Sequence, residues 1–274
     1  MESKVITALI TPLKNHAVDF DGLKENILYQ IESGVDGLLV LGTTGEGATL
    51  SDQERRAVIE TAVNLKQIPL MVNVGDISTE KTIQKAKEAE ELGADVLLVI
   101  APYYCRPSQT GLAAHFEAVA RSTNLPILLY NNPKRTGVEI SLETLIRLYQ
   151  EENIIGIKDA SGSISYVASI RSALPDFELY AGDDLLSIPY QALGAKGVIS
   201  VLSNLLPFEM TELTVEKYFE LIPLMEASHI ETNPVPIKAM MNRAGMAAGE
   251  VRTPLAPLSP IHQEKIDELM GAYV

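Results

Sequence analysis

The stretch LGADVLLVIA, residues 92–101, decides the fold because the chain repeats its pattern. Similar stretches are SGVDGLLVLG at 33–42 and LGAKGVISVL at 193–202. Each contains a glycine, a short polar turn and an apolar run, and each follows an amphipathic stretch. A glycine just past a helix readily adopts the left-handed conformation, and an apolar run is typical of a parallel strand buried on both faces. The repeated unit is therefore predicted to be helix, glycine turn and strand.

The same unit extends over most of the chain. Strands are expected at 5–11, 37–42, 69–74, 95–101, 126–131, 154–159, 178–182 and 197–202. Helices are expected at 21–33, 51–66, 79–92, 109–122, 141–150, 161–173, 184–193 and 207–221. This alternation implies parallel strands with right-handed crossovers, and eight units predict a closed (β/α)₈ TIM barrel. An open doubly wound sheet is the alternative, but no G-x-G-x-x-G turn follows the first strand.

The alternation stops near residue 222, and this change predicts the domain organisation. Helix-like stretches at 236–247 and 260–272 suggest a small helical addition. We therefore expect a catalytic barrel over 1–222 and a C-terminal helical segment over 223–274 that packs on the barrel.

Composition restricts the class of protein. The 274 residues carry a net charge of −14, which argues against nucleic acid or an anionic membrane as partner. No apolar run approaches the roughly 18 residues of a membrane helix. The single cysteine, Cys105, excludes an intrachain disulfide, and with no signal peptide recognised this predicts a cytoplasmic protein. The histidines and Cys105 lack metal-ligand spacing and no cofactor motif is present, so we expect neither metal nor cofactor.

One lysine lies at the end of a strand that is predicted to be buried, where a charged side chain is energetically unfavourable. In IIGIKDASG, residues 154–162, Lys158 closes an apolar run, and burial of an unpaired ammonium is unfavourable. It is either a structural lysine paired with Asp159 or another carboxylate, or a Schiff-base nucleophile whose pKa burial lowers. Burial alone leaves the two interpretations equally weighted.

Active sites of such barrels lie at the C-terminal strand ends. There GTTGEG, residues 42–47, forms either a tight turn or a carboxylate site with donors from Thr43 and Thr44. Tyr130 is either a core residue or a proton carrier, and Arg135 is either solvated or a bidentate carboxylate ligand. Combined with a reactive amine, these groups suit a small α-keto acid.

Several sequence blocks occur in the order of a known family. They are GTTGEGATLS, PYYCRPSQTGLAAHF, YNNPKRTG, NIIGIKDASG, GDD, GVISVLSN and NPVPIK. From about Val5 to about Pro260 the chain resembles the dihydrodipicolinate synthase family, which belongs to the superfamily of N-acetylneuraminate lyase and other pyruvate-dependent class I aldolases. The resemblance implies a (β/α)₈ barrel with a C-terminal helical domain, usually assembled as a homotetramer of two tight dimers.

The resemblance also implies catalytic roles. Lys158 matches the lysine that forms the imine with pyruvate, and Tyr130 matches the tyrosine that relays protons. Thr44 matches the threonine that links this tyrosine to a second one. Tyr104 matches that second tyrosine, which the family donates across the tight-dimer interface.

Three further positions match substrate-binding residues of the family. Thr43 matches a threonine that holds the pyruvate carboxylate, Arg135 an arginine that receives substrate carboxylate, and Ile199 a position whose carbonyl lies near the active centre.

The implied reaction condenses pyruvate with L-aspartate 4-semialdehyde, in the diaminopimelate route to lysine, with no cofactor beyond the covalent imine. Alternatives are N-acetylneuraminate lyase, 2-keto-3-deoxygluconate aldolase or a non-catalytic keto-acid-binding barrel. GTTGE and Arg-Thr-Gly favour the synthase, because sialic acid lyases have Gly-Ser-Thr-Gly-Glu and lack Arg-Thr-Gly.

The chain departs from the family pattern in places. Asn132 and Lys134 stand where we expect a small or apolar residue and a serine. The stretch between SVLSN and NPVPIK is about a dozen residues short, which leaves the assembly open between dimer and tetramer.

Feedback regulation is a further expectation. Lysine-inhibited members bind lysine with polar or acidic groups, and the corresponding positions here are Asp52, Arg55, Ile77 and Lys81. Two of these are cationic and repel a cationic ligand. The sequence therefore predicts weak or absent inhibition by lysine.

Overall fold

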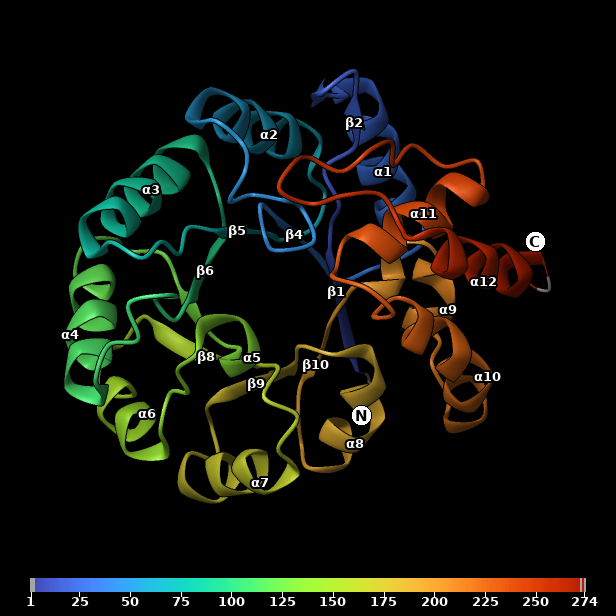
Figure 1. The fold of residues 1–274 in the computed structure, drawn as a ribbon. Helices are drawn as coiled ribbons and strands as arrows, with labels where there is room; N and C mark the ends of the chain where they lie inside the picture. Colours follow the sequence, from blue (N-terminus) through green and yellow to red (C-terminus); the bar gives the residue numbers. More distant parts are fainter. Residues whose placement is uncertain (1–2, 272, 274) are drawn as a thin grey trace. The chain divides into compact units, whose positions relative to one another are not determined.

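The computed structural model describes residues 3–271 and 273 and contains a closed barrel of eight parallel strands in the order β1-β10-β9-β8-β7-β6-β5-β4 (Figure 1). This closed order confirms the predicted (β/α)₈ barrel and excludes the open sheet. The strands match the eight predicted ones: β1 (Lys4–Ala8), β4 (Gly37–Val40), β5 (Leu70–Asn73), β6 (Val96–Ile100), β7 (Ile127–Asn131), β8 (Ile154–Asp159), β9 (Glu178–Ala181) and β10 (Gly197–Ser200).

The chain divides into two compact units, which we call the central unit (Met71–Ile199 together with Ser3) and the terminal unit (Lys4–Leu70 with residues 200–271 and 273). The predicted division into a barrel over 1–222 and a helical segment over 223–274 stays a prediction. Helix α10 (Val215–Ala227) contains residues on both sides of position 222.

Four helices of the central unit begin at a serine whose side chain caps the first turn. Ser78, Ser108, Ser141 and Ser163 each accept a hydrogen bond from a backbone N–H in the first turn, which satisfies a group that a helix start leaves unpaired. The elements are α3 (Thr79–Leu92), α4 (Gln109–Ala120), α5 (Pro133–Thr136), α6 (Leu142–Leu148), α7 (Ile164–Ala173), η1 (Asp184–Leu186) and α8 (Ser187–Ala192).

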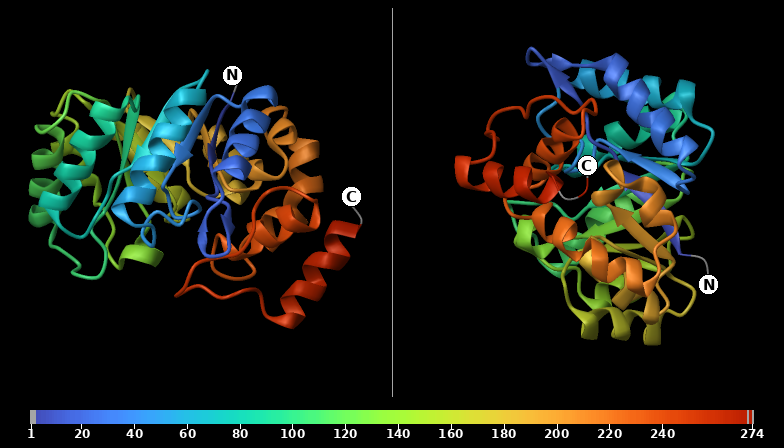
Figure 2. Two further views of the ribbon diagram at one scale, coloured as in Figure 1. Left: turned by 90° about the horizontal axis from the view of Figure 1, so that it is seen from above. Right: turned by 90° about the vertical axis from the view of Figure 1, so that its right-hand side faces the viewer.

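The terminal unit contains the remaining helices, and Figures 1 and 2 show α10, α11 and α12, coloured orange to red, beside one another. The predicted helix over 207–221 is two helices, because Thr214 caps a new helix by accepting from the Lys217 N–H. The elements are α1 (Phe20–Glu32), α2 (Asp52–Leu65), η2 (Leu202–Asn204), α9 (Pro207–Thr211), α10, α11 (Val235–Arg243) and α12 (Pro260–Gly271).

A small hairpin in the terminal unit was not predicted. Strands β2 (Leu13–Lys14) and β3 (Ala17–Val18) pair antiparallel around Asn15 and His16, whose φ angles are 52° and 64°. Two consecutive residues in the left-handed conformation form a hairpin turn whose usual sequence is Asn-Gly. Here the second residue is histidine, so the sequence does not show the usual turn signal. The glycines of the repeated unit behave as predicted: φ is +82°, +98° and +85° at Gly34, Gly93 and Gly194.

Candidate active site

Lys158 and Tyr130 lie side by side in the central unit. They are neighbours in register on β8 and β7, and Tyr180 on β9 is the neighbour of Lys158 on the other side. Residues paired in this way point to the same face of a sheet. Lys158 is 5% exposed and Tyr130 6% exposed, and the lysine Nζ lies 4.7 Å from the centroid of the tyrosine ring. The structure therefore brings together the two residues predicted to carry the chemistry.

Burial lowers the pKa of Lys158 below its ordinary value of 10.5. Tyr130 and the carboxylates of Asp184 and Asp183 act in the opposite direction, while the Arg135 guanidinium adds to the lowering. Desolvation outweighs the other effects because an ammonium loses its hydration inside the barrel. A larger fraction of the side chain is then the neutral amine, the form that attacks a carbonyl.

The alternative of a structural ion pair is wrong for Lys158. Within the described chain, no carboxylate forms an ion pair with its ammonium, and Asp159 in particular does not. Consecutive residues of a strand point to opposite faces, so Asp159 points away from Lys158. A buried, unpaired lysine beside a tyrosine favours the nucleophile.

Asp159 has its own buried network, which sequence reasoning missed. Its carboxylate accepts hydrogen bonds from Asn131 Nδ2 at 2.7 Å, from Tyr190 Oη at 2.8 Å and from Ser161 Oγ at 2.8 Å. Burial, together with the Asp159 charge, raises the pKa of Tyr190 and keeps its hydroxyl protonated as a donor. The network fixes the ends of β7 and β8, which position Tyr130 and Lys158. Helix α7, which follows this strand, is capped by Ser163.

The hydroxyl oxygen of Tyr130 accepts a hydrogen bond from Asn132 Nδ2 at 2.9 Å. Asn132 caps the short helix α5, where its Oδ1 accepts from the Arg135 N–H at 3.2 Å. Arg135 is exposed, and its charge acts on Lys158. The predicted lysine, tyrosine and arginine thus belong to one local group.

The central unit also contains two further predicted residues, Tyr104 and Ile199. Tyr104, in the loop after β6, is 88% exposed and has a φ of +66°. Its exposure contrasts with the burial of Lys158 and Tyr130. Ile199 is fully buried in β10.

The loop GTTGEG follows β4 in the terminal unit, and its packing explains its glycines. A Cβ atom on Gly47 would lie 2.1 Å from the Leu41 carbonyl oxygen, so this glycine permits a close backbone approach. Thr44 is buried, and its Oγ1 accepts a hydrogen bond from Asn233 Nδ2 at 2.9 Å. Thr43 is half-buried, and its carbonyl accepts a hydrogen bond from the Glu46 N–H at 3.1 Å. The tight turn is thus present, with a threonine hydroxyl held in place.

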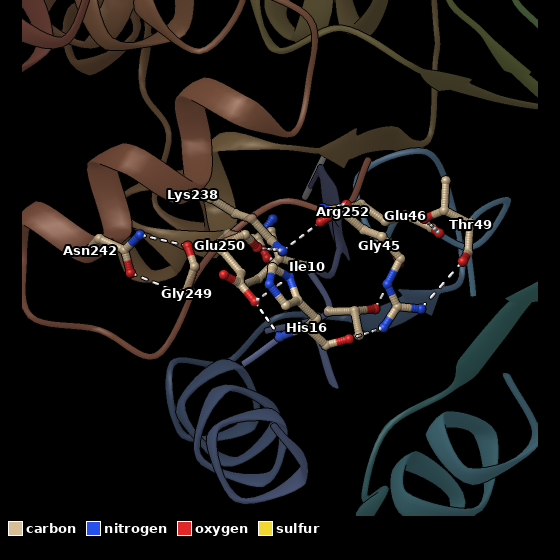
Figure 3. A network of polar contacts seen from close by, with 12 residues as sticks. Ile10, His16, Gly45, Glu46, Thr49, Lys238, Asn242, Gly249, Glu250 and Arg252 are labelled. Atoms are coloured by element: carbon tan, nitrogen blue, oxygen red, sulfur yellow. Dashed lines mark hydrogen bonds and ion pairs between the residues drawn. The ribbon is translucent and has the colours of Figure 1, made fainter. Parts of the chain in front are cut away.

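A polar network in the terminal unit holds this loop, as Figure 3 shows. The carboxylate of Glu46 is paired with Lys238 and also accepts from the Arg252 N–H at 2.8 Å. Lys238 donates further to the Glu250 carbonyl at 2.8 Å. Burial lowers the pKa of Lys238, and Glu46 opposes this lowering. The NPVPIK motif, which supplies Asn233 and Lys238, therefore anchors the loop, a role that the sequence did not indicate.

Among residues 3–271 and 273, no group of three or more His, Cys, Asp or Glu side chains is arranged to hold a metal ion. In the same part of the chain, no helix is both long and apolar enough to cross a bilayer.

Comparisons with known proteins agree on one family. The sequence profile of the Dihydrodipicolinate synthetase family matches residues 1–272. A curated 4-hydroxy-tetrahydrodipicolinate synthase from a Hydrogenobaculum species is 40% identical over 282 residues, which cover 98% of this chain and 97% of the relative.

Solved structures agree as well. The crystal structure of dihydrodipicolinate synthase from Aquifex aeolicus is 39% identical, with a TM-score of 0.97 and coverage of 99% of this chain and 98% of that one. The chloride-inhibited dihydrodipicolinate synthase from Acinetobacter baumannii, solved as a complex with pyruvate, is 35% identical, with a TM-score of 0.95 and the same two coverages.

Proposed function

This chain belongs to the Dihydrodipicolinate synthetase family, and from that membership we propose that Lys158 forms an imine with pyruvate, which then condenses with L-aspartate 4-semialdehyde. The activity is that of a 4-hydroxy-tetrahydrodipicolinate synthase, a lyase of the class I aldolase type in lysine biosynthesis. The observation that supports the imine most directly is the buried, unpaired Lys158 beside Tyr130. The pyruvate complex of the Acinetobacter baumannii enzyme supports the choice of first substrate.

Each chemical step uses groups of the chain and the two substrates. The Lys158 amine attacks the ketone carbon of pyruvate, and the ketone oxygen leaves as water. The protonated imine withdraws electrons, so the methyl group loses a proton and an enamine forms. The enamine carbon bonds to the aldehyde carbon of the second substrate. The amine of that substrate then attacks the imine carbon, which closes the ring and releases Lys158. The imine is the electron sink, so no further cofactor is proposed.

Proton transfers need a carrier within hydrogen-bond reach of the reacting atoms. Tyr130 has this role, because its buried ring lies beside the reactive amine. Thr44 continues the relay toward a second tyrosine, Tyr104. Thr43 and Arg135 bind the carboxylates of the substrates, since a hydroxyl and a guanidinium are suitable donors. The carbonyl of Ile199 lies at the active centre.

Assembly and location follow from the same family membership. We propose that the chain forms a homodimer or homotetramer in the cytoplasm. An exposed tyrosine on left-handed backbone, as at Tyr104, is well suited to insertion into a neighbouring subunit. Nucleic acid and membrane are not proposed as partners, because the chain carries a net charge of −14.

The test of the function is a coupled assay that compares three reactions. Pyruvate with L-aspartate 4-semialdehyde is expected to give turnover, whereas N-acetylneuraminate and 2-keto-3-deoxygluconate are expected to give little or no cleavage. Preferential cleavage of either sugar acid would assign the chain to another aldolase branch. Absence of turnover with all substrates would support a barrel that only binds keto acids.

Replacement of Gly182 by alanine is expected to displace the reactive amine. A Cβ at this position would lie 3.1 Å from Lys158 Cε and 2.9 Å from the Asp159 carbonyl oxygen. Misplacement of a reacting group by a fraction of an ångström or more is costly, so kcat should fall by about 10- to 100-fold. The control is Gly111→Ala, whose Cβ meets its neighbours at 3.4 Å or more. Wild-type kcat in Gly182→Ala would contradict this packing argument.

Lysine is expected to inhibit weakly or not at all. Arg55 is buried and donates to the Gly47 carbonyl at 2.8 Å, while Lys81 is exposed at the start of α3. Because cationic side chains repel a cationic effector, Lys81→Glu should bind lysine better than the wild type. Inhibition curves against lysine test both statements, and strong inhibition of the wild type at sub-millimolar lysine would contradict the first.

A further inference from the structure

We propose that Asn132 is a positioning residue for the proton carrier Tyr130, an inference that rests on the proposed function. The amide Nδ2 donates a hydrogen bond to the Tyr130 hydroxyl oxygen at 2.9 Å. A donor at this oxygen stabilises negative charge on it and leaves the hydroxyl proton to be donated elsewhere. Asn132 thereby orients the phenol for the proton transfers of imine and enamine chemistry.

The orientation of the amide follows from its second contact. Oδ1 of Asn132 accepts a hydrogen bond from the Arg135 backbone N–H at 3.2 Å. A backbone N–H is only a donor, so the oxygen of the amide must face Arg135 and the nitrogen must face Tyr130. The contact with the phenol is therefore a donation from Asn132, and the two hydrogen bonds fix both ends of the amide.

Burial gives this hydrogen bond its effect. Asn132 is 8% exposed and Tyr130 6% exposed, and electrostatic interactions strengthen where water is excluded. Lys158 lies over the ring of Tyr130, and Arg135, Asp183 and Asp184 are the other charged groups that act on this lysine. Unlike these charges, the amide stabilises the phenolate oxygen without adding a net charge to the site.

Asn132 departs from the residue type expected at this position. The family pattern leads us to expect a small or apolar side chain in this position, and neither kind donates a hydrogen bond. Asn132 also has an ordinary structural role, because it caps α5 and its carbonyl accepts from Thr136 Oγ1 at 3.0 Å. The experiment must therefore separate the cap from the donor.

Two substitutions achieve this separation. Asn132→Asp keeps an acceptor for the cap and removes the donor, and Asn132→Ser also keeps a capping oxygen but adds no charge. Both variants should melt close to the wild type. Loss of a hydrogen bond to a charged group in the transition state should lower kcat by about 10- to 100-fold. KM for pyruvate should change little, and the pH of half-maximal kcat should rise in Asn132→Ser.

The control is Ser141→Ala, which removes the cap of α6; Ser141 forms hydrogen bonds with Thr144 and Gln109. It should lower the melting temperature and leave the pH profile of kcat unchanged. Wild-type kcat and pH profile in Asn132→Ser would overturn the inference while the proposed function stands. Failure of the wild type to form a borohydride-trapped pyruvate adduct would overturn the proposed function, and with it the inference.

Discussion

Replacement of Lys158 by alanine is expected to abolish the condensation, with kcat/KM reduced by roughly 10⁴-fold or more, because the covalent intermediate cannot form. Arginine at the same position retains a positive charge but should be equally inactive, since a guanidinium stays protonated and does not form the imine. The two variants together distinguish a nucleophile from a fixed charge.

Borohydride trapping gives the direct measurement. In the wild type, pyruvate and borohydride should leave a stable adduct on the peptide that contains Lys158, and in both variants that adduct should be missing. Lys24→Ala is the control, because Lys24 is exposed on α1 and pairs with Asp21. An unmodified Lys158 peptide in the wild type would contradict the imine mechanism.

Stability separates loss of chemistry from loss of fold. Burial disfavours the protonated form of Lys158 in the folded state. An apolar side chain of similar length removes this cost, so Lys158→Met should melt at or above the wild-type temperature while remaining inactive. A large drop in its melting temperature would mean that the lysine has a structural role after all.

A large loss of stability is expected when the ion pair between Glu46 and Lys238 is broken. The two side chains are 1% and 2% exposed, so Lys238→Met leaves a buried carboxylate without its cation. Breaking a buried pair in this way costs about 3–5 kcal/mol. The free energy of unfolding from urea titration measures the loss, and Glu46→Gln should also be destabilised.

An exposed pair is the matched control. Arg56 and Glu60 on α2 are 2.9 Å apart and about half exposed, and loss of such a pair costs less than about 1 kcal/mol. Arg56→Ala should therefore unfold almost as the wild type does. If Lys238→Met behaves like this control, the buried pair does not hold the GTTGEG loop in the way described.

Much of the barrel could be predicted because its strands are buried on both faces and are therefore apolar runs. Lys158 could be found for the same reason, since it is a charged residue at the end of such a run. The partners of Asp159 could not, because Asn131, Ser161 and Tyr190 come from separate elements and meet only in three dimensions. The contact of Lys238 with Glu46 spans 192 positions, and no local pattern indicates a partner so distant.

The discontinuity of the terminal unit has a consequence for synthesis on the ribosome. Apart from Ser3, the central unit is the single segment Met71–Ile199, so all of it is made before residue 238. The loop that contains Thr44 and Glu46 is translated early, yet its anchors Asn233 and Lys238 arrive among the last residues. A nascent chain thus exposes an unanchored loop until translation is nearly complete. Enzymatic activity should appear late and abruptly as the chain lengthens.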